Sequence, residues 1–164
     1  MFAPSRLLMQ LTLVAVAAVA QSASAQTAKK ADPQIERGRY IVKTTGCNDC
    51  HTSGYAMAGG DVPVSQWLKG DSVGWRGPWG TTYPANVRLA LQKLTEDEWV
   101  KTAHTVQYRP PMPWFSLHAM TTQDLRAMYR FIKSLGDPGE PAPAYVPPDQ
   151  EPKGPFIQFP APPK

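Results

Sequence analysis

The chain has 164 residues, enough for one domain, and a formal net charge of +4 from 17 Lys and Arg against 13 Asp and Glu. So small a positive excess, with no dense basic stripe, argues against nucleic acid binding. After residue 25, no apolar segment approaches the length that spans a membrane.

The first 25 residues have the features of a secretory signal peptide. Arg6 supplies the positive charge, residues 7–20 are almost wholly apolar, and Ala-Ser-Ala at 23–25 is a typical cleavage site. We expect cleavage near Ala25, export to the periplasm and no stable membrane insertion afterwards. An uncleaved anchor is the alternative, although the apolar run is shorter than the ~20 residues that span a bilayer.

Residues 26–33 are expected to form a flexible segment, at the end of which a helix begins. Asp32 is a good N-cap and Pro33 a good first helical residue. A helix over residues 33–44 places Ile35, Gly38, Ile41 and Val42 on one side.

Both cysteines of the chain follow this helix, in Cys47-Asn48-Asp49-Cys50-His51. A dithiol oxidoreductase would need a preceding strand, and a structural zinc site would need a second Cys/His pair. Neither accompanies the motif, and a simple disulfide leaves the adjoining histidine unexplained. The fourth reading is a covalently bound c-type haem, because C-x-x-C-H is the signature of its attachment.

The spacing of the motif suits that chemistry. Thiols at positions i and i+3 of one helical turn can reach the two vinyl groups on one edge of a porphyrin. His51 then lies under the ring and can ligate the iron, provided that its other nitrogen donates to a backbone carbonyl.

Residues 52–83 contain seven glycines and no long helical or alternating pattern. Trp67, Trp75 and Trp79 lie among the glycines. We interpret this segment as a loop whose aromatic side chains are buried against a large flat group that the chain itself does not supply.

Two further helices are predicted in the second half. Thr95 to Glu98 form a capping box, followed by an apolar side with Trp99, Val100 and Ala103. A third helix opens at residues 121–124 and ends before Gly136. Its apolar stripe consists of Leu125, Met128, Tyr129, Ile132 and Leu135.

Residues 137–164 hold ten of the 18 prolines. Such a tail is expected to form neither helix nor sheet ladders, and is either an extended strap or a flexible tail. Phe156, Ile157 and Phe159 favour the strap.

The candidates for a second iron ligand are the methionines and histidines that follow the motif, namely Met57, Met112, Met120, Met128, His104 and His118. We expect Met112, because Pro111 and Pro113 stiffen the loop that presents its thioether, and a Met ligand opposite His raises the reduction potential. His104 is the rival, although both remaining histidines are expected to be surface or hydrogen-bonded residues, and Met128 to be packing.

The stretches GRYIVKTTGCNDCHTSGYAMAGG and YRPPMPWFSLHAMTTQDLRAMYRFIKSL resemble the class I (mono-haem) cytochrome c domain over residues 34–136. They are most similar to the cytochrome c domains of alcohol and sugar-acid dehydrogenase complexes. The resemblance implies an all-α fold, with three to five helices and long loops around one covalent haem c. Cys47 and Cys50 would attach the haem, His51 and Met112 would ligate its iron, and Gly38 and Tyr129 would meet where the first and last helices cross.

This chain differs from those cytochromes in two ways that bear on the identity of its redox partner. The dehydrogenase cytochromes carry three haem domains, whereas this chain has one attachment motif. The minimal class I domain has no Pro-rich tail. The resemblance implies a periplasmic electron-transfer protein, not an enzyme, that passes one electron per cycle between redox partner proteins. The alternatives are a fixed subunit of a periplasmic dehydrogenase or oxidase complex and, in another class, a haem-based sensor or peroxidase.

Overall fold

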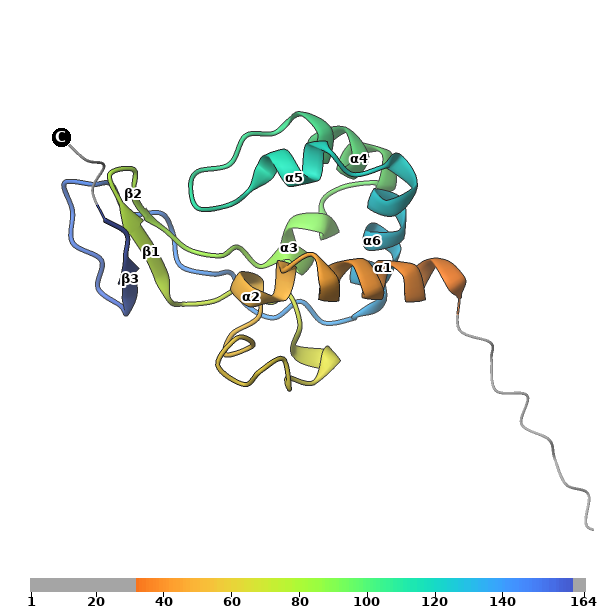
Figure 1. Ribbon diagram of the computed structural model, residues 1–164, viewed down its shortest axis with the longest axis horizontal. Helices are drawn as coiled ribbons and strands as arrows, with labels where there is room; N and C mark the ends of the chain where they lie inside the picture. The colour runs from red at the N-terminus through yellow and green to blue at the C-terminus, as the bar shows by residue number, and fades with distance from the viewer. Residues whose placement is uncertain (1–31, 161–164) are drawn as a thin grey trace, which may run out of the picture. The chain divides into compact units, whose positions relative to one another are not determined.

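The computed structural model describes residues 32–160, which form helices joined by long loops, with one small sheet (Figure 1). The predicted signal peptide and residues 26–31 lie outside the described residues. None of the helices in the described part is long and apolar enough to cross a membrane. The elements are α1 (Pro33–Thr44), α2 (Cys47–His51), a 3-10 turn (Val64–Gln66), β1 (Gly74–Gly77), β2 (Gly80–Thr82), α3 (Val87–Gln92), α4 (Glu96–Thr105), α5 (Trp114–His118), α6 (Thr122–Ser134) and β3 (Phe156–Gln158).

The first helix begins and ends as predicted. The Asp32 carboxylate accepts a 2.8 Å hydrogen bond from the Gln34 amide, and Pro33 is the first helical residue. Gly38, Ile41 and Val42 are buried. They face α6, the helix with which α1 makes its main contact.

The predicted partner of Gly38 at this crossing is wrong. The nearest neighbours of Gly38 are the backbone of Ala127 and the Cβ of Phe131. Tyr129 instead points to the loop between α3 and α4, where its hydroxyl donates to the Leu94 carbonyl at 2.9 Å. Tyr129 and Phe131 are two residues apart, or about 200° around a helix, so they point to different sides of α6.

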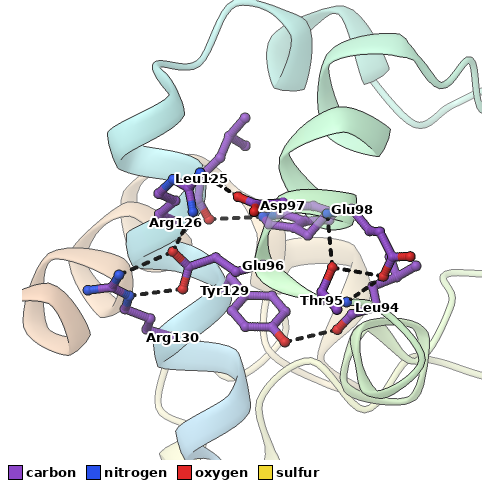
Figure 2. A network of polar contacts seen from close by, with 10 residues as sticks. Leu94, Thr95, Glu96, Asp97, Glu98, Leu125, Arg126, Tyr129 and Arg130 are labelled. Atoms are coloured by element: carbon purple, nitrogen blue, oxygen red, sulfur yellow. Dashed lines mark hydrogen bonds and ion pairs between the residues drawn. The ribbon is translucent and has the colours of Figure 1, made fainter.

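Helices α4 and α6 are also confirmed. Thr95 and Glu98 make the reciprocal hydrogen bonds of the predicted capping box, and the Thr121 hydroxyl caps α6. Figure 2 shows how the two helices are joined: Glu96 accepts from Arg126 and Arg130, at 2.8 and 3.0 Å. The indole of Trp99 donates to the Leu125 carbonyl at 2.9 Å.

The tryptophans of the glycine-rich loop have aromatic partners within the chain, which the sequence did not indicate. Trp67 is 3% exposed and packs edge-to-face against Tyr55 and Phe131. Trp75 and Trp79 contact the ring of Phe159, at centroid distances of 5.8 and 5.4 Å. Partners more than sixty residues away are not visible in a local pattern.

A three-stranded sheet adds to the helical fold, and the sequence pattern did not indicate it. β1 pairs antiparallel with β2 and parallel with β3, in the order β2-β1-β3. The prediction that the Pro-rich tail forms no ladder is therefore wrong at Phe156–Gln158. Prolines flank these residues at 155 and 160 but do not interrupt them, so their amide groups remain free to pair.

One buried arginine ties the loops together. Arg88, on α3, is 3% exposed, and its guanidinium group donates five hydrogen bonds to backbone carbonyls. These carbonyls come from the 3-10 turn, from the residue after it and from the end of α6. They belong to Val64, Ser65, Trp67, Leu135 and Asp137, with distances of 2.7–3.2 Å.

Candidate functional site

The C-x-x-C-H motif forms a helix of its own, α2, which follows α1 after a short turn. Cys47 and Cys50 are half-buried, and both are free thiols rather than a disulfide. The Thr45 hydroxyl lies 3.3 Å from the Cys47 sulfur. The two thiols thus occupy the i and i+3 positions of one helical turn, as two attachment points on one porphyrin edge require.

The electrostatics of the two thiols argue against the dithiol oxidoreductase. Burial raises the pKa of Cys47, and the Thr45 hydrogen bond only partly opposes this. The pKa of Cys50 is raised by burial, with smaller contributions from the charges of Asp49 and Asp71. An attacking thiol needs the opposite shift, toward the thiolate.

The zinc alternative is not supported either. Within residues 32–160, which include every Cys and His of the chain, no group of three or more His, Cys, Asp or Glu side chains could hold a metal ion. Tetrahedral zinc would need four such ligands. The carboxylates near Cys50, those of Asp49 and Asp71, do not complete such a set with the cysteines and His51.

The His51 ring is held by a backbone carbonyl, as the sequence predicts. Its Nδ1 lies 2.8 Å from the Ala85 carbonyl oxygen. A carbonyl can only accept, so Nδ1 carries the hydrogen and Nε2 keeps its lone pair free for a metal. Burial lowers the pKa of His51, and the hydrogen bond to Ala85 opposes this only in part. The lowered pKa favours the neutral imidazole, the form that ligates iron.

The sequence did not identify Ala85, and the side chain of the neighbouring residue ties its segment to the backbone of the C-terminal tail. The amide group of the next residue, Asn86, donates to the carbonyls of Pro138 and Glu140, at 2.7 and 2.9 Å. The Asn86 side-chain oxygen also caps α3. The acceptor for His51 is thereby fixed by the beginning of the C-terminal tail. Ala85 lies 34 residues from His51, so no local signal could have found it.

Two buried side chains brace the end of the motif helix. The Thr52 hydroxyl donates to the Asn48 side chain at 2.7 Å and accepts from the Leu68 amide at 2.8 Å. The His51 carbonyl accepts from the Gly70 amide at 2.8 Å. The imidazole therefore projects from a backbone that is fixed on both sides.

Met112 lies on another segment, the loop between α4 and α5. Its amide donates to the Arg109 carbonyl at 3.3 Å, and its carbonyl accepts from the Trp114 amide at 2.9 Å. The side chain is half-buried and packs against the core. The structure thus brings Cys47, Cys50 and His51 together on α2, whereas Met112 is presented separately.

Two of the other candidate methionines are less suited to bind a metal. Met57 is 94% exposed, and Met128 is 3% exposed in the core, where packing was predicted. Met120 is partly buried against the core. His118 is hydrogen-bonded, as predicted: its Nε2 lies 2.9 Å from the Val106 carbonyl.

His104 differs from its predicted role as a surface or hydrogen-bonded residue. Its Nε2 is buried and has no hydrogen-bond partner among the described residues. Buried polar atoms in native proteins almost always have one. His104 therefore remains the alternative to Met112.

The donor set fits a covalently bound haem. It has two free thiols one turn apart, and a neutral imidazole whose Nδ1 is engaged and whose Nε2 is free. His51 and a thioether are a known pair of haem ligands. No residue of α2 competes for these positions through a disulfide or an ion pair.

The comparison with known families agrees with this chemistry. The family model described as "Cytochrome c" matches residues 35–136, more than half of the chain. No curated protein and no solved structure matches the chain. Proteins of that family bind covalently attached haem c through a C-x-x-C-H motif, and Cys47, Cys50 and His51 fit this attachment.

Proposed function

The chain belongs to the cytochrome c family, and on that premise we propose that it is a periplasmic electron carrier whose haem iron is ligated by His51 and Met112. The observation that carries the proposal is the hydrogen bond between His51 Nδ1 and the Ala85 carbonyl. It orients the imidazole and leaves Nε2 for iron on the same helix that presents the two thiols.

The chain's residues would divide the work as follows. Cys47 and Cys50 would hold the haem through their sulfur atoms, so that it stays in place without further affinity. When bound, the haem supplies the iron whose change between the ferric and ferrous states carries one electron. Met112 would supply a thioether ligand, which raises the reduction potential and favours electron transfer over the binding of external ligands.

Partners would be other redox proteins that dock briefly. Tyr108 and Phe115, on either side of Met112 in the sequence, are 40% and 63% exposed. Exposed aromatic residues suit the small, weak interfaces of electron-transfer complexes. The modest positive net charge would steer the protein to acidic patches on its partners, with a strong dependence on salt. Neither this charge nor its distribution suits nucleic acid.

The second candidate is a fixed electron-transfer subunit of a periplasmic dehydrogenase or oxidase complex, as the likeness to dehydrogenase cytochromes suggests. Phe156 and Ile157 on the edge strand β3 are 37% and 47% exposed and offer an apolar surface for a stable neighbour. Purification from native membranes and periplasm separates the two: a stoichiometric complex favours the subunit, and a free monomer favours the shuttle.

The optical spectrum of the purified holoprotein tests the ligation. We expect that the ferric wild type shows the weak red absorption band of a thioether–iron bond, and that Met112→Ala loses it and binds carbon monoxide rapidly when reduced. Met120→Ala is the matched control and should retain the band.

An unchanged spectrum in Met112→Ala would show that Met112 is not the ligand. Loss of a low-spin spectrum in His104→Ala would then assign the position to His104. Rapid binding of carbon monoxide to the wild type would favour a sensor or peroxidase instead.

A further inference from the structure

The C-terminal tail contacts the segment whose Ala85 carbonyl holds the His51 ring, and the loop that carries Met112. Near its start, the Pro138 and Glu140 carbonyls accept from Asn86, the neighbour of Ala85. Further along, the Val146 backbone pairs with Thr81, with N···O distances of 2.7 and 3.0 Å. These residues lie beyond residue 136, where the match to the family ends.

Tyr145 makes the contact that reaches the Met112 loop. The guanidinium carbon of Arg109 lies 4.1 Å from the centroid of the Tyr145 ring, a close cation–π geometry. On its other side, the Tyr145 hydroxyl donates to the Trp79 carbonyl at 2.8 Å. The ring is therefore held by the β1–β2 hairpin while its face meets Arg109.

Gly80 allows the tail to lie close against the β1–β2 hairpin. Gly80 has a φ of +95°, and a Cβ there would lie 2.5 Å from the Val146 carbonyl oxygen and 2.8 Å from the Tyr145 hydroxyl. Any other residue at position 80 would push Tyr145 and Val146 away. Arg76 adds a 2.8 Å hydrogen bond to the Gln150 carbonyl.

Arg109 is the first residue of the turn that presents Met112. Its carbonyl accepts from the Met112 amide at 3.3 Å, so residues 109–112 form one hydrogen-bonded turn. The Arg109 side chain is otherwise exposed and makes no hydrogen bond or ion pair with another described side chain. Tyr145 is thus the contact that restrains this side chain.

We propose that Tyr145 is a positioning residue for Met112: by holding Arg109, the tail keeps the 109–112 turn closed and the thioether on the haem iron. The proposal rests on the proposed function, because it takes Met112 as the ligand. Loss of the cation–π contact would leave the covalent haem and His51 in place and allow the turn to open more often.

Imidazole binding to the ferric holoprotein measures that opening, since an added ligand reaches the iron only after Met112 has left. The observed affinity is proportional to the open fraction. An exposed cation–π contact corresponds to a change of about two- to fivefold in that fraction. We expect Tyr145→Leu and Arg109→Gln each to bind imidazole about two- to fivefold more tightly than the wild type.

Two controls isolate the contact. Tyr145→Phe keeps the aromatic face but loses the hydroxyl bond to the Trp79 carbonyl, so its affinity should lie between those of the wild type and Tyr145→Leu. Phe156→Leu removes the other cation–π pair of the tail, in which the guanidinium carbon of Arg76 lies 5.8 Å from the Phe156 ring centroid. It should leave imidazole binding unchanged, because that pair does not touch the Met112 loop.

The double variant Arg109→Gln/Tyr145→Leu decides whether the two residues act through each other. We expect it to bind imidazole no more tightly than either single variant. Effects that multiply, or affinities equal to the wild type in both single variants, would overturn the proposal.

Hydrogen–deuterium exchange over residues 105–113 gives a second readout that does not depend on which residue ligates iron. Faster exchange there in Tyr145→Leu, but not in Phe156→Leu, is expected. If the wild type lacks the thioether band while this exchange pattern holds, the ligand assignment fails and the contact between tail and loop stands. If the band is present and exchange is unchanged, the proposed role of the Tyr145–Arg109 contact fails, while Met112 remains the ligand.

Discussion

At the scale of single residues, Gly38 shows how a helix interior can require glycine. Glycine there costs ~0.5–1 kcal/mol relative to alanine, because its backbone loses more freedom on folding. A Cβ at Gly38, however, would lie 2.1 Å from the Ala127 carbonyl oxygen and 2.7 Å from the Phe131 Cβ. The close approach of α1 to α6 therefore outweighs helix propensity at this position.

Gly38→Ala is expected to lower the free energy of unfolding by ~1–3 kcal/mol, the usual cost of overpacking a close contact. Urea unfolding of the holoprotein measures it. Lys43→Ala, at an exposed position of the same helix, should change stability by no more than ~0.5 kcal/mol. A more stable Gly38→Ala variant would mean that the crossing has room for a methyl group.

At the scale of elements, the junction of α4 and α6 is held by an ion-pair network in which Glu96 lies between Arg126 and Arg130, and Asp97 also pairs with Arg126 (Figure 2). Hydrogen bonds from Arg130 and then Arg126 lower the pKa of Glu96. A carboxylate whose pKa is lower in the folded state adds stability above its unfolded pKa of about 4.3. That stability is lost as the pH falls through the folded pKa.

Glu96→Gln should therefore be less stable than the wild type at pH 6, and the difference should shrink as the pH falls below about 4.3. The effect will be small, because ion pairs near the surface contribute little. Urea unfolding of both proteins between pH 3 and 6 measures this difference in the free energy of unfolding, which should follow a titration curve. Glu151→Gln, at an exposed position in the tail, should show no such trend, and a constant difference for Glu96→Gln would contradict the linkage.

At the scale of the whole molecule, Arg88 joins segments that are far apart in the sequence. It ties the 3-10 turn and Trp67 to the end of α6 and the start of the tail. Two residues before it, Asn86 binds the same tail. The carbonyl of Ala85 thus belongs to a segment that is anchored at several points, which explains how a loop-rich chain holds one imidazole firmly.

Arg88→Met is expected to cost about 3 kcal/mol or more of the free energy of unfolding, because five carbonyls, one buried and four partly buried, would lose this donor. Arg88→Lys should be intermediate, since an ammonium group has three donors instead of five. Urea unfolding of the two variants measures both. A loss below ~1 kcal/mol in Arg88→Met would show that the carbonyls find other partners.

The local features of this fold could be predicted from the sequence. Asp32 and Thr95 cap their helices through bonds that span two or three residues, and the apolar stripe of α6 is visible in its spacing. The attachment motif is equally local, because both thiols and the imidazole lie within one short helix. Physical chemistry over a few residues determines such features.

Only the tertiary structure decided what depends on contacts between distant segments. It placed Ala85 against His51, Phe131 rather than Tyr129 against Gly38, and Phe156–Gln158 beside β1. It also brought Tyr145 of the tail to Arg109 of the Met112 loop. The attachment chemistry of the site is encoded in five consecutive residues, whereas its rigidity arises from chain segments that meet only when the whole domain has packed.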